Sequence, residues 1–389
     1  MLYPKHVMRD DAMADQSRSS DYPARAVLEG VPRVHFYEGG KRCPEDFTFP
    51  SSLRACLEYM GESYGCEHLM EPQPIRQLCC TYAYIMSACG YAFSLSWRPG
   101  WHMDNNSILF MSAEPDEPFR RAFQAVGHSH EIILKQEGRN NEAYFRRRII
   151  ESIRDKRRPV LGFGIVGPPE CCIVTGYDED GNVLTGWSFF QGFPEFNAGV
   201  EFEPSGYFRK RDWFKDTHSL IIIGEKEEQP PRGELYRGIL KWALEAARTP
   251  MVHGRSSGIA AYQAWAEHLL RDEDFPVEDK AVLRERHMVH DDAVGMVAEA
   301  RWYASLFLPQ IARHESGMAE ELLAAASCYA AEHDLMWRIW GLVGGIGREE
   351  PKVMKLAEPS VRRQIVPVIL QARDRDVEAA DHIERALTK

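Results

Sequence analysis

The stretch from residue 167 to residue 191, GPPECCIVTGYDEDGNVLTGWSFFQ, decides the expected fold of this chain. Two apolar runs, 171–177 and 183–187, flank the turn sequence DEDGN. Apolar runs on either side of a short turn that contains Gly and Asn predict a β-hairpin. A Gly-Pro-Pro-Glu segment that ends at Glu170 precedes the first run. Three interpretations of the Glu-Cys-Cys sequence are open at this point: a catalytic centre, a metal site or the start of an ordinary core strand.

The segments around the hairpin place helices before strands. After Pro50, the apolar residues Leu53, Cys56, Leu57 and Met60 have helical spacing, so we expect a helix over 51–60 with Ser51 or Ser52 as its N-cap. Further helices are expected over 77–88 (ending at Gly90), 118–126 and 142–156, and further strands over 159–165 and 219–224. Helices followed by antiparallel strands favour an α+β fold over a doubly wound sheet.

The composition is that of a soluble globular protein. The chain has 389 residues, 44% of them hydrophobic and 27% charged, and a net charge of −11. No apolar run reaches the roughly 18 residues that a membrane span needs, so no membrane partner is expected. The acidic balance, without a basic stripe, argues against nucleic acid as the main partner.

A shift in composition at 225–232, EKEEQPPR, divides the chain. We expect a disordered leader over 1–30, a mixed domain over 31–228 and a helical bundle over 229–389, in which prolines such as Pro309 and Pro367 break or start helices. The leader lacks a signal-peptide pattern. The nine cysteines are an odd number and include no CxxC pair, so reduced thiols in the cytoplasm are expected, with no metal and no cofactor.

The order of elements over roughly 47–187 resembles the papain-like, C39-like domain of the butirosin biosynthesis H family, which is accompanied by a helical C-terminal domain. The segments that carry this resemblance are FPSSLRACLEYMG (49–61), TYAYIMSACGYAFSL (81–95) and the PVLGFG…ECCIVTGYDEDGNVLTGW block. The family resembles cysteine peptidases and includes acyltransferases that move an acyl group from a carrier protein to an amine. The resemblance therefore implies acyl-transfer or amide-bond chemistry.

The resemblance also implies where the reactive groups stand, and the chain departs from the pattern there. The nucleophilic Cys of the family falls at Thr48, the His at Glu170 and the orienting carboxylate at Trp187. By residue type, Thr48 and Glu170 are a poor nucleophile and base, and Trp187 cannot orient a base. Either the site is rebuilt from other groups or catalysis is lost and a binding cleft is kept.

Three residues are candidates for a rebuilt catalytic centre. Cys80 begins the second expected helix, where the helix dipole favours a thiolate, although core packing is the competing interpretation. His102 lies beside Asp104 in a loop flanked by Gly and Pro, and is otherwise a surface histidine. Glu170 follows a rigid Gly-Pro-Pro approach and is a base, a clamp for an amine or a solvated carboxylate.

The expected cleft is lined by Thr48, Asp104, Cys171, Cys172 and Trp187. Because side chains alternate along a strand, Cys171 and Cys172 point to opposite faces, and Cys172 is expected on the face of Glu170. Core packing is the default for both thiols. The pairs Cys66 and His68, and His128 and His130, lack a recognised zinc-ligand spacing.

Two functions remain open from the sequence. One is an acyltransferase or amidohydrolase-type cysteine enzyme that uses Cys80, with His102 or Glu170 as base, on a small-molecule or carrier-protein-bound substrate. The other is an inactive relative that binds a small molecule, a peptide or a carrier protein. The helical part is a candidate surface for homo-oligomers. A thiol within hydrogen-bond reach of His102 or Glu170 favours the enzyme, whereas thiols buried among aliphatic side chains favour the binding protein.

Overall fold

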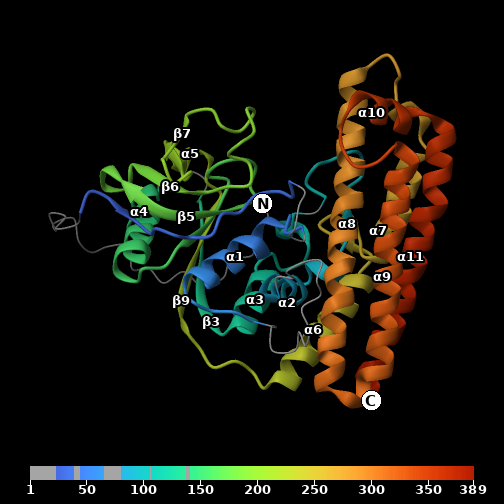
Figure 1. Ribbon diagram of the computed structural model, residues 1–389, viewed down its shortest axis with the longest axis horizontal. Helices are drawn as coiled ribbons and strands as arrows, with labels where there is room; N and C mark the ends of the chain where they lie inside the picture. The colour runs from blue at the N-terminus through green and yellow to red at the C-terminus, as the bar shows by residue number, and fades with distance from the viewer. Residues whose placement is uncertain (1–22, 39–43, 65–79, 106, 137–140) are drawn as a thin grey trace.

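The computed structural model describes residues 23–38, 44–64, 80–105, 107–136 and 141–389, and all structural statements below concern these residues. Residues 1–22 of the expected leader lie outside them. The expectation is wrong for its last residues, because Ala26–Val27 pairs with the strand Cys171–Asp178 and Leu28 is fully buried. Figure 1 shows a sheet-containing part beside a stack of long C-terminal helices, with α1, α2 and α3 between the sheet and the helices. The expected α+β class, with an antiparallel sheet followed by a helical part, is confirmed.

The main sheet contains eight strands, and all its pairings are antiparallel. Its order is β3-β9-β4-β5-β6-β8-β7, and β1 pairs with β5 beyond the end of β4. The strands are β1 (Ala26–Val27), β3 (His128–Leu134), β4 (Val160–Phe163), β5 (Cys171–Asp178), β6 (Val183–Trp187), β7 (Val200–Phe202), β8 (Phe208–Arg211) and β9 (Ser219–Lys226). The expected hairpin is β5–β6, whose residues are almost all buried because both faces of these strands are covered.

The helices of the first part are α1 (Thr48–Tyr59), α2 (Cys80–Cys89), α3 (Glu117–Val126), α4 (Glu142–Ile150) and the short α5 (Trp213–Asp216). The expected N-cap of α1 is wrong. The helix begins at Thr48 after Phe47, which provides no side-chain cap, and Ser51 and Ser52 are buried inside the helix. Thr48 is thus the first residue of the helix, and Pro50 fits the first turn because the early backbone N–H groups need no partner there.

The second part contains α6 (Arg232–Arg248), α7 (Ile259–Leu269), α8 (Lys280–His314), α9 (Ala319–Val343), α10 (Glu350–Ala357) and α11 (Pro359–Thr388). The expectation that Pro309 and Pro367 break or start helices is wrong, because Pro309 lies inside α8 and Pro367 inside α11. Pro351 and Pro359, for which the same was expected, do lie in the first turns of α10 and α11. Two short strands also occur, β10 (Met251–Val252) and β11 (Arg255–Ser257). β11 pairs with β2 (Ser96–Trp97) of the first part.

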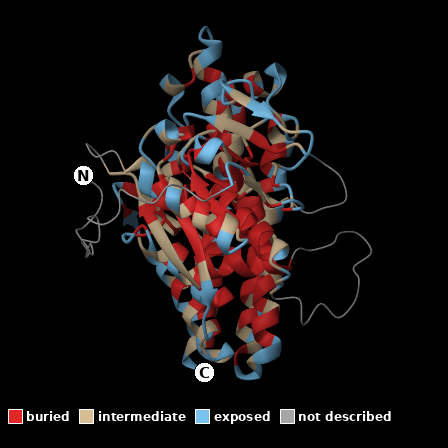
Figure 2. Cartoon of the chain, turned by 90° about the vertical axis from the view of Figure 1, so that its left-hand side faces the viewer, coloured by how far each residue is buried: buried red, intermediate tan, exposed pale blue. Residues whose placement is uncertain are grey.

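The two parts share their hydrophobic cores. One core joins residues of the sheet and of α1–α3 to Tyr303, Phe307 and Ile311 of α8. The other joins Leu95 and Trp97 of the first part to the helical part. Figure 2 shows the buried residues concentrated in the middle of the molecule. A site between the two parts is therefore built on packed elements of both. No helix in the described ranges combines the length and apolar character of a membrane span.

Candidate active site

The first residue of α1 and the residue before β5 meet through their side chains. The Thr48 hydroxyl donates a hydrogen bond to Glu170 Oε2 at 2.6 Å. The backbone N–H of Cys171 donates to Thr48 Oγ1 at 3.2 Å, which fixes the hydroxyl between two partners. Thr48 is 5% exposed and Glu170 is partly buried. The two positions that the family resemblance assigns to nucleophile and base are thus in direct contact.

The Gly-Pro-Pro-Glu segment brings Glu170 to α1. Gly167 has φ 106°, and a Cβ atom there would lie 2.7 Å from Phe190, so only glycine fits. The N–H of Glu170 donates to Pro168 O at 2.6 Å, which makes a tight turn before the strand begins. Beyond this turn, Cys171 lies near Ser52 and Cys56 of α1, and the expected facing of Cys172 toward Glu170 stays a prediction.

The electrostatic environment of Glu170 favours its protonated form. Burial raises the pKa of Glu170 to about 7, and the negative charge of Asp292 on α8 adds to the rise. Hydrogen bonds with Thr48 and Ser107 act in the opposite direction. A carboxyl group that titrates near neutral pH is suited to accept and return a proton.

The helix α8 presents an acidic face to the start of α1. Asp292, Met296 and Glu299 lie four and three residues apart, so they share one face of the helix. The backbone N–H of Asp46 donates to Glu299 Oε1 at 3.0 Å, and Tyr82 OH also hydrogen-bonds to Glu299. Burial raises the pKa of Asp46 to about 6, with the charge of Asp292 adding to it. The helical part therefore forms one wall of the site.

A narrow cavity of about 10 Å³ lies between the two parts, and it is lined by neighbours of Thr48 and Glu170 rather than by the pair itself. Phe47, which precedes Thr48, lines it together with Ser107, which hydrogen-bonds to Glu170. Asn105, Ser96 and Ser257 line it from the β2–β11 side, and Met296 lines it from α8. This volume accommodates about one water molecule.

The thiols occupy core positions. Cys56, Cys80, Cys89, Cys171, Cys172 and Cys328 are all buried, whereas Cys43, Cys66 and Cys79 lie outside the described residues. Burial raises the pKa of both Cys89 and Cys172 to about 12. Cys80 is the first described residue of α2, is 5% exposed, and does not line the cavity beside Glu170.

The remaining predicted site residues take no part in the hydrogen bond between Thr48 and Glu170. His102 is partly exposed in the loop after β2, and it does not line the cavity either. Asp104, next to it in the loop, forms an ion pair with Arg255 at 2.6 Å that ties this loop to β11. Trp187 donates from Nε1 to Val31 O at 2.9 Å and packs edge-on against Tyr207, so its indole holds the segment after β1.

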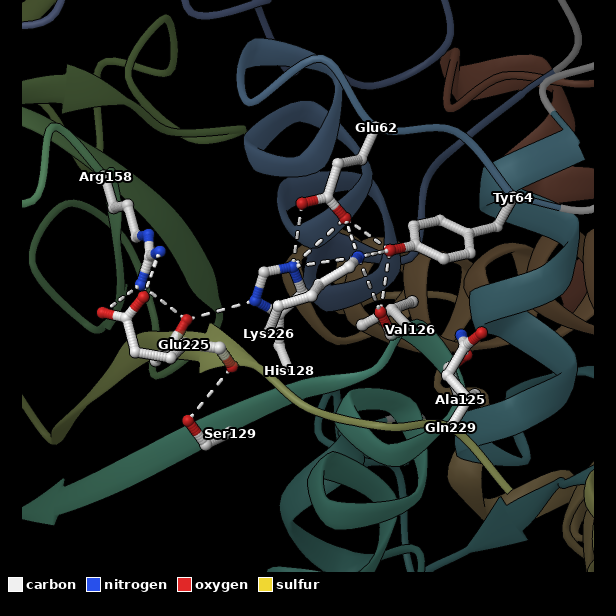
Figure 3. Close-up of polar contacts among 11 residues, drawn as sticks. Glu62, Tyr64, Ala125, Val126, His128, Ser129, Arg158, Glu225, Lys226 and Gln229 are labelled. Atoms are coloured by element: carbon white, nitrogen blue, oxygen red, sulfur yellow. Dashed lines mark hydrogen bonds and ion pairs between the residues drawn. The ribbon is translucent and has the colours of Figure 1, made fainter. Parts of the chain in front are cut away.

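A second polar cluster connects the end of α1 to the ends of β3 and β9. His128 Nε2 lies 3.0 Å from Glu62 Oε1, and Lys226 hydrogen-bonds to Glu62 and to Tyr64 OH, as Figure 3 shows. Burial alone would raise the pKa of Glu62, but the hydrogen bonds from Lys226, Tyr64 and His128 lower it overall. These groups satisfy one another's hydrogen-bonding capacity, so the role of the cluster is structural: it links the end of α1 to β3 and β9.

From the sequence, His128 was weighed only as a metal ligand. Its contact with Glu62 was not predicted, because Glu62 lies 66 residues earlier in the chain. Among the described residues no group of three or more His, Cys, Asp or Glu side chains could hold a metal ion. Neither a protein-family model nor a curated protein sequence matches the chain.

Proposed function

We propose that the chain is an acyl-transfer or amide-bond enzyme in which Thr48 is the nucleophile and Glu170 the general base. The observation that carries this proposal is the 2.6 Å hydrogen bond from the Thr48 hydroxyl to a carboxyl group whose pKa is raised to about 7. A hydroxyl nucleophile needs an adjacent base within hydrogen-bond reach, and this pair meets that requirement. A papain-like ancestry, in which a nucleophile at a helix start faces a base at a strand start, fits the same two positions.

The chemistry follows from the contact. The Thr48 proton moves to the Glu170 carboxylate while Oγ1 bonds to the acyl carbon of the substrate. When the tetrahedral intermediate collapses, the bond to the leaving group breaks, and the leaving amine or thiol takes the proton from Glu170. A second amine or a water then repeats the sequence on the Thr48 ester and releases the acyl group. The substrate class is therefore an acyl compound, either a small molecule or one bound to a carrier protein.

The buried thiols favour this hydroxyl mechanism over a relocated cysteine nucleophile. A nucleophilic thiol needs a lowered pKa. Each described cysteine is buried, and burial raises the pKa of the Cys171 thiol, which is next to Glu170 in sequence, well above its usual range.

The proposal is tested with a fluorophosphonate probe, which forms a covalent bond to activated hydroxyl groups, followed by peptide mass spectrometry. We expect the wild type to be labelled at Thr48, Thr48→Ser to retain labelling, and Thr48→Ala to lose it. Glu170→Gln, which keeps the shape but removes the base, should slow labelling about 10²–10⁴-fold. Thr249→Ala at the end of α6 is the matched control and should label like the wild type.

Labelling at a cysteine or at no residue would contradict the proposal. Absence of any label would instead support the alternative function, an inactive relative that keeps the cleft to bind a small molecule, a peptide or a carrier protein.

A further inference from the structure

Asn105 is a buried amide that faces the cavity between the two parts. It lies in the loop after β2, is 3% exposed and lines the cavity together with Phe47 and Ser107. Its Nδ2 atom is buried and has no hydrogen-bond partner among the residues that the structure describes. Buried amide donors are nearly always paired in folded proteins, so an unpaired one requires an explanation.

The orientation of this amide is fixed by its surroundings. The backbone N–H of Arg98 donates to Asn105 Oδ1 at 2.8 Å, so the other end of the amide, Nδ2, must point away from Arg98. The carbonyl of Asn105 accepts a hydrogen bond from Ser96, and the neighbouring Asp104 is bound by Arg255. These contacts hold the donor in place before any ligand arrives, as preorganised stabilisation of charge requires.

We propose that Asn105 Nδ2 binds the carbonyl oxygen of the acyl substrate and stabilises the negative charge that develops on it. This inference rests on the proposed function, because it needs an acyl group at Thr48. The cavity is lined by a neighbour of each member of that pair, namely Phe47, which precedes Thr48, and Ser107, whose hydroxyl acts on the pKa of Glu170.

The step balances without any further reactant. The Thr48 proton goes to Glu170, the new bond forms between Oγ1 and the acyl carbon, and the π electron pair of the carbonyl moves to its oxygen. That oxygen accepts the Nδ2–H of Asn105. When the carbonyl re-forms, the bond to the leaving group breaks and the proton returns from Glu170 to the leaving group.

Two substitutions separate this role from a structural one. Asn105→Asp keeps an acceptor for Arg98 N–H but replaces the donor, whereas Asn105→Ala removes both. Asn182→Asp, in the exposed turn between β5 and β6, is the matched control for the added charge. If Asn105 held only the loop, Asn105→Ala would lose stability and Asn105→Asp would behave like the wild type.

We expect both Asn105 variants to be labelled at Thr48 by the fluorophosphonate about 10²–10³-fold more slowly than the wild type, because a phosphonyl oxygen occupies the place of the carbonyl oxygen. Asn105→Ala should keep the pH dependence of labelling, since the proton acceptor is unchanged.

The failures of the two proposals are distinguishable. Rapid labelling at Thr48 in both Asn105 variants would overturn the role of Asn105 and leave the Thr48–Glu170 pair intact. No labelling of the wild type would overturn both. Slow labelling of Asn105→Ala alone, with lowered stability, would assign Asn105 to the loop structure and overturn the carbonyl-binding role.

Discussion

Buried carboxyl and imidazole groups in this chain respond to pH in opposite directions. The pKa of Glu170 is raised to about 7 because burial disfavours its charge. The folded state is therefore favoured while Glu170 is protonated, and that contribution is lost as the pH rises from the unfolded pKa through about 7. Burial lowers the pKa of His290 to about 3, and it lowers that of His287 as well.

His287 and His290 on α8 are buried as neutral rings. Trp265 Nε1 donates to His290 Nδ1 at 3.2 Å, so the proton of His290 is on Nε2, which is buried without a partner among the described residues. Both ring nitrogens of His287 are also buried without a hydrogen-bond partner among the described residues. Above the pKa of about 6.5 that a histidine has in the unfolded chain, both rings are neutral in the folded and the unfolded state, so they do not make stability depend on pH. Below it, the unfolded chain takes up protons that the folded chain excludes, so stability falls with the pH.

Replacement of His287 by leucine should make the protein less sensitive to acid. His287→Leu removes one imidazole that the unfolded chain protonates at pH 5 more readily than the folded chain does, because burial lowers its pKa. We therefore expect a smaller loss of the free energy of unfolding between pH 8 and pH 5, measured by urea denaturation, and a gain in stability at pH 5. His314→Leu, at the exposed end of α8, is the control. A variant as acid-sensitive as the wild type would show that His287 is already charged in the folded state.

At the scale of elements, local patterns predicted the interior of each helix and strand better than its ends. The β5–β6 hairpin was predictable because two apolar runs flank the DEDGN turn, and the interior of α3 was predicted as well. The start of α1 was not, since Ser51 and Ser52 are good caps in isolation but are buried within the helix. Pro309 and Pro367 lie inside α8 and α11, two long helices whose buried faces pack in the cores.

The candidate site shows the same limit. The positions of Thr48 and Glu170 were predictable from the order of elements. The hydrogen bond between them and the raised pKa of Glu170 were not, because that pKa is raised by burial and by Asp292, which lies 122 residues further along the chain. The loop after Trp97 gave a clear signal of a cleft, but it pointed to His102 and Asp104. Asn105, next in sequence, is the member that lines the cavity.

At the scale of the whole molecule, one buried ion network holds the two parts together. Arg301 of α8 lies 2.7 Å from Asp376 of α11 and 3.2 Å from Glu332 of α9, and all three side chains are fully buried. Arg301 also donates to Ala92 O of the first part at 3.0 Å. With both hydrophobic cores shared, the chain should unfold as one cooperative unit.

Removal of Arg301 should therefore destabilise the entire molecule. Arg301→Ala leaves two carboxylates buried without their cation, which costs about 3–5 kcal/mol. We expect a single transition in differential scanning calorimetry, shifted to a lower temperature. Arg363→Ala, an exposed arginine on α11, should change the free energy of unfolding by less than about 0.5 kcal/mol. Two separate transitions, or an Arg301→Ala variant as stable as the Arg363→Ala control, would contradict this description.

The pH dependence of covalent labelling at Thr48 tests the central claim most directly. If Glu170 is the base, the labelling rate should rise as the carboxyl loses its proton, reach half its maximum near pH 7 and level off above it, in keeping with the pKa of about 7. In Glu170→Gln this transition should disappear and the rate should stay low across the range. A wild-type rate that keeps rising above pH 9, or a transition that persists in Glu170→Gln, would show that another group activates the hydroxyl and would contradict the assignment of the Thr48–Glu170 pair.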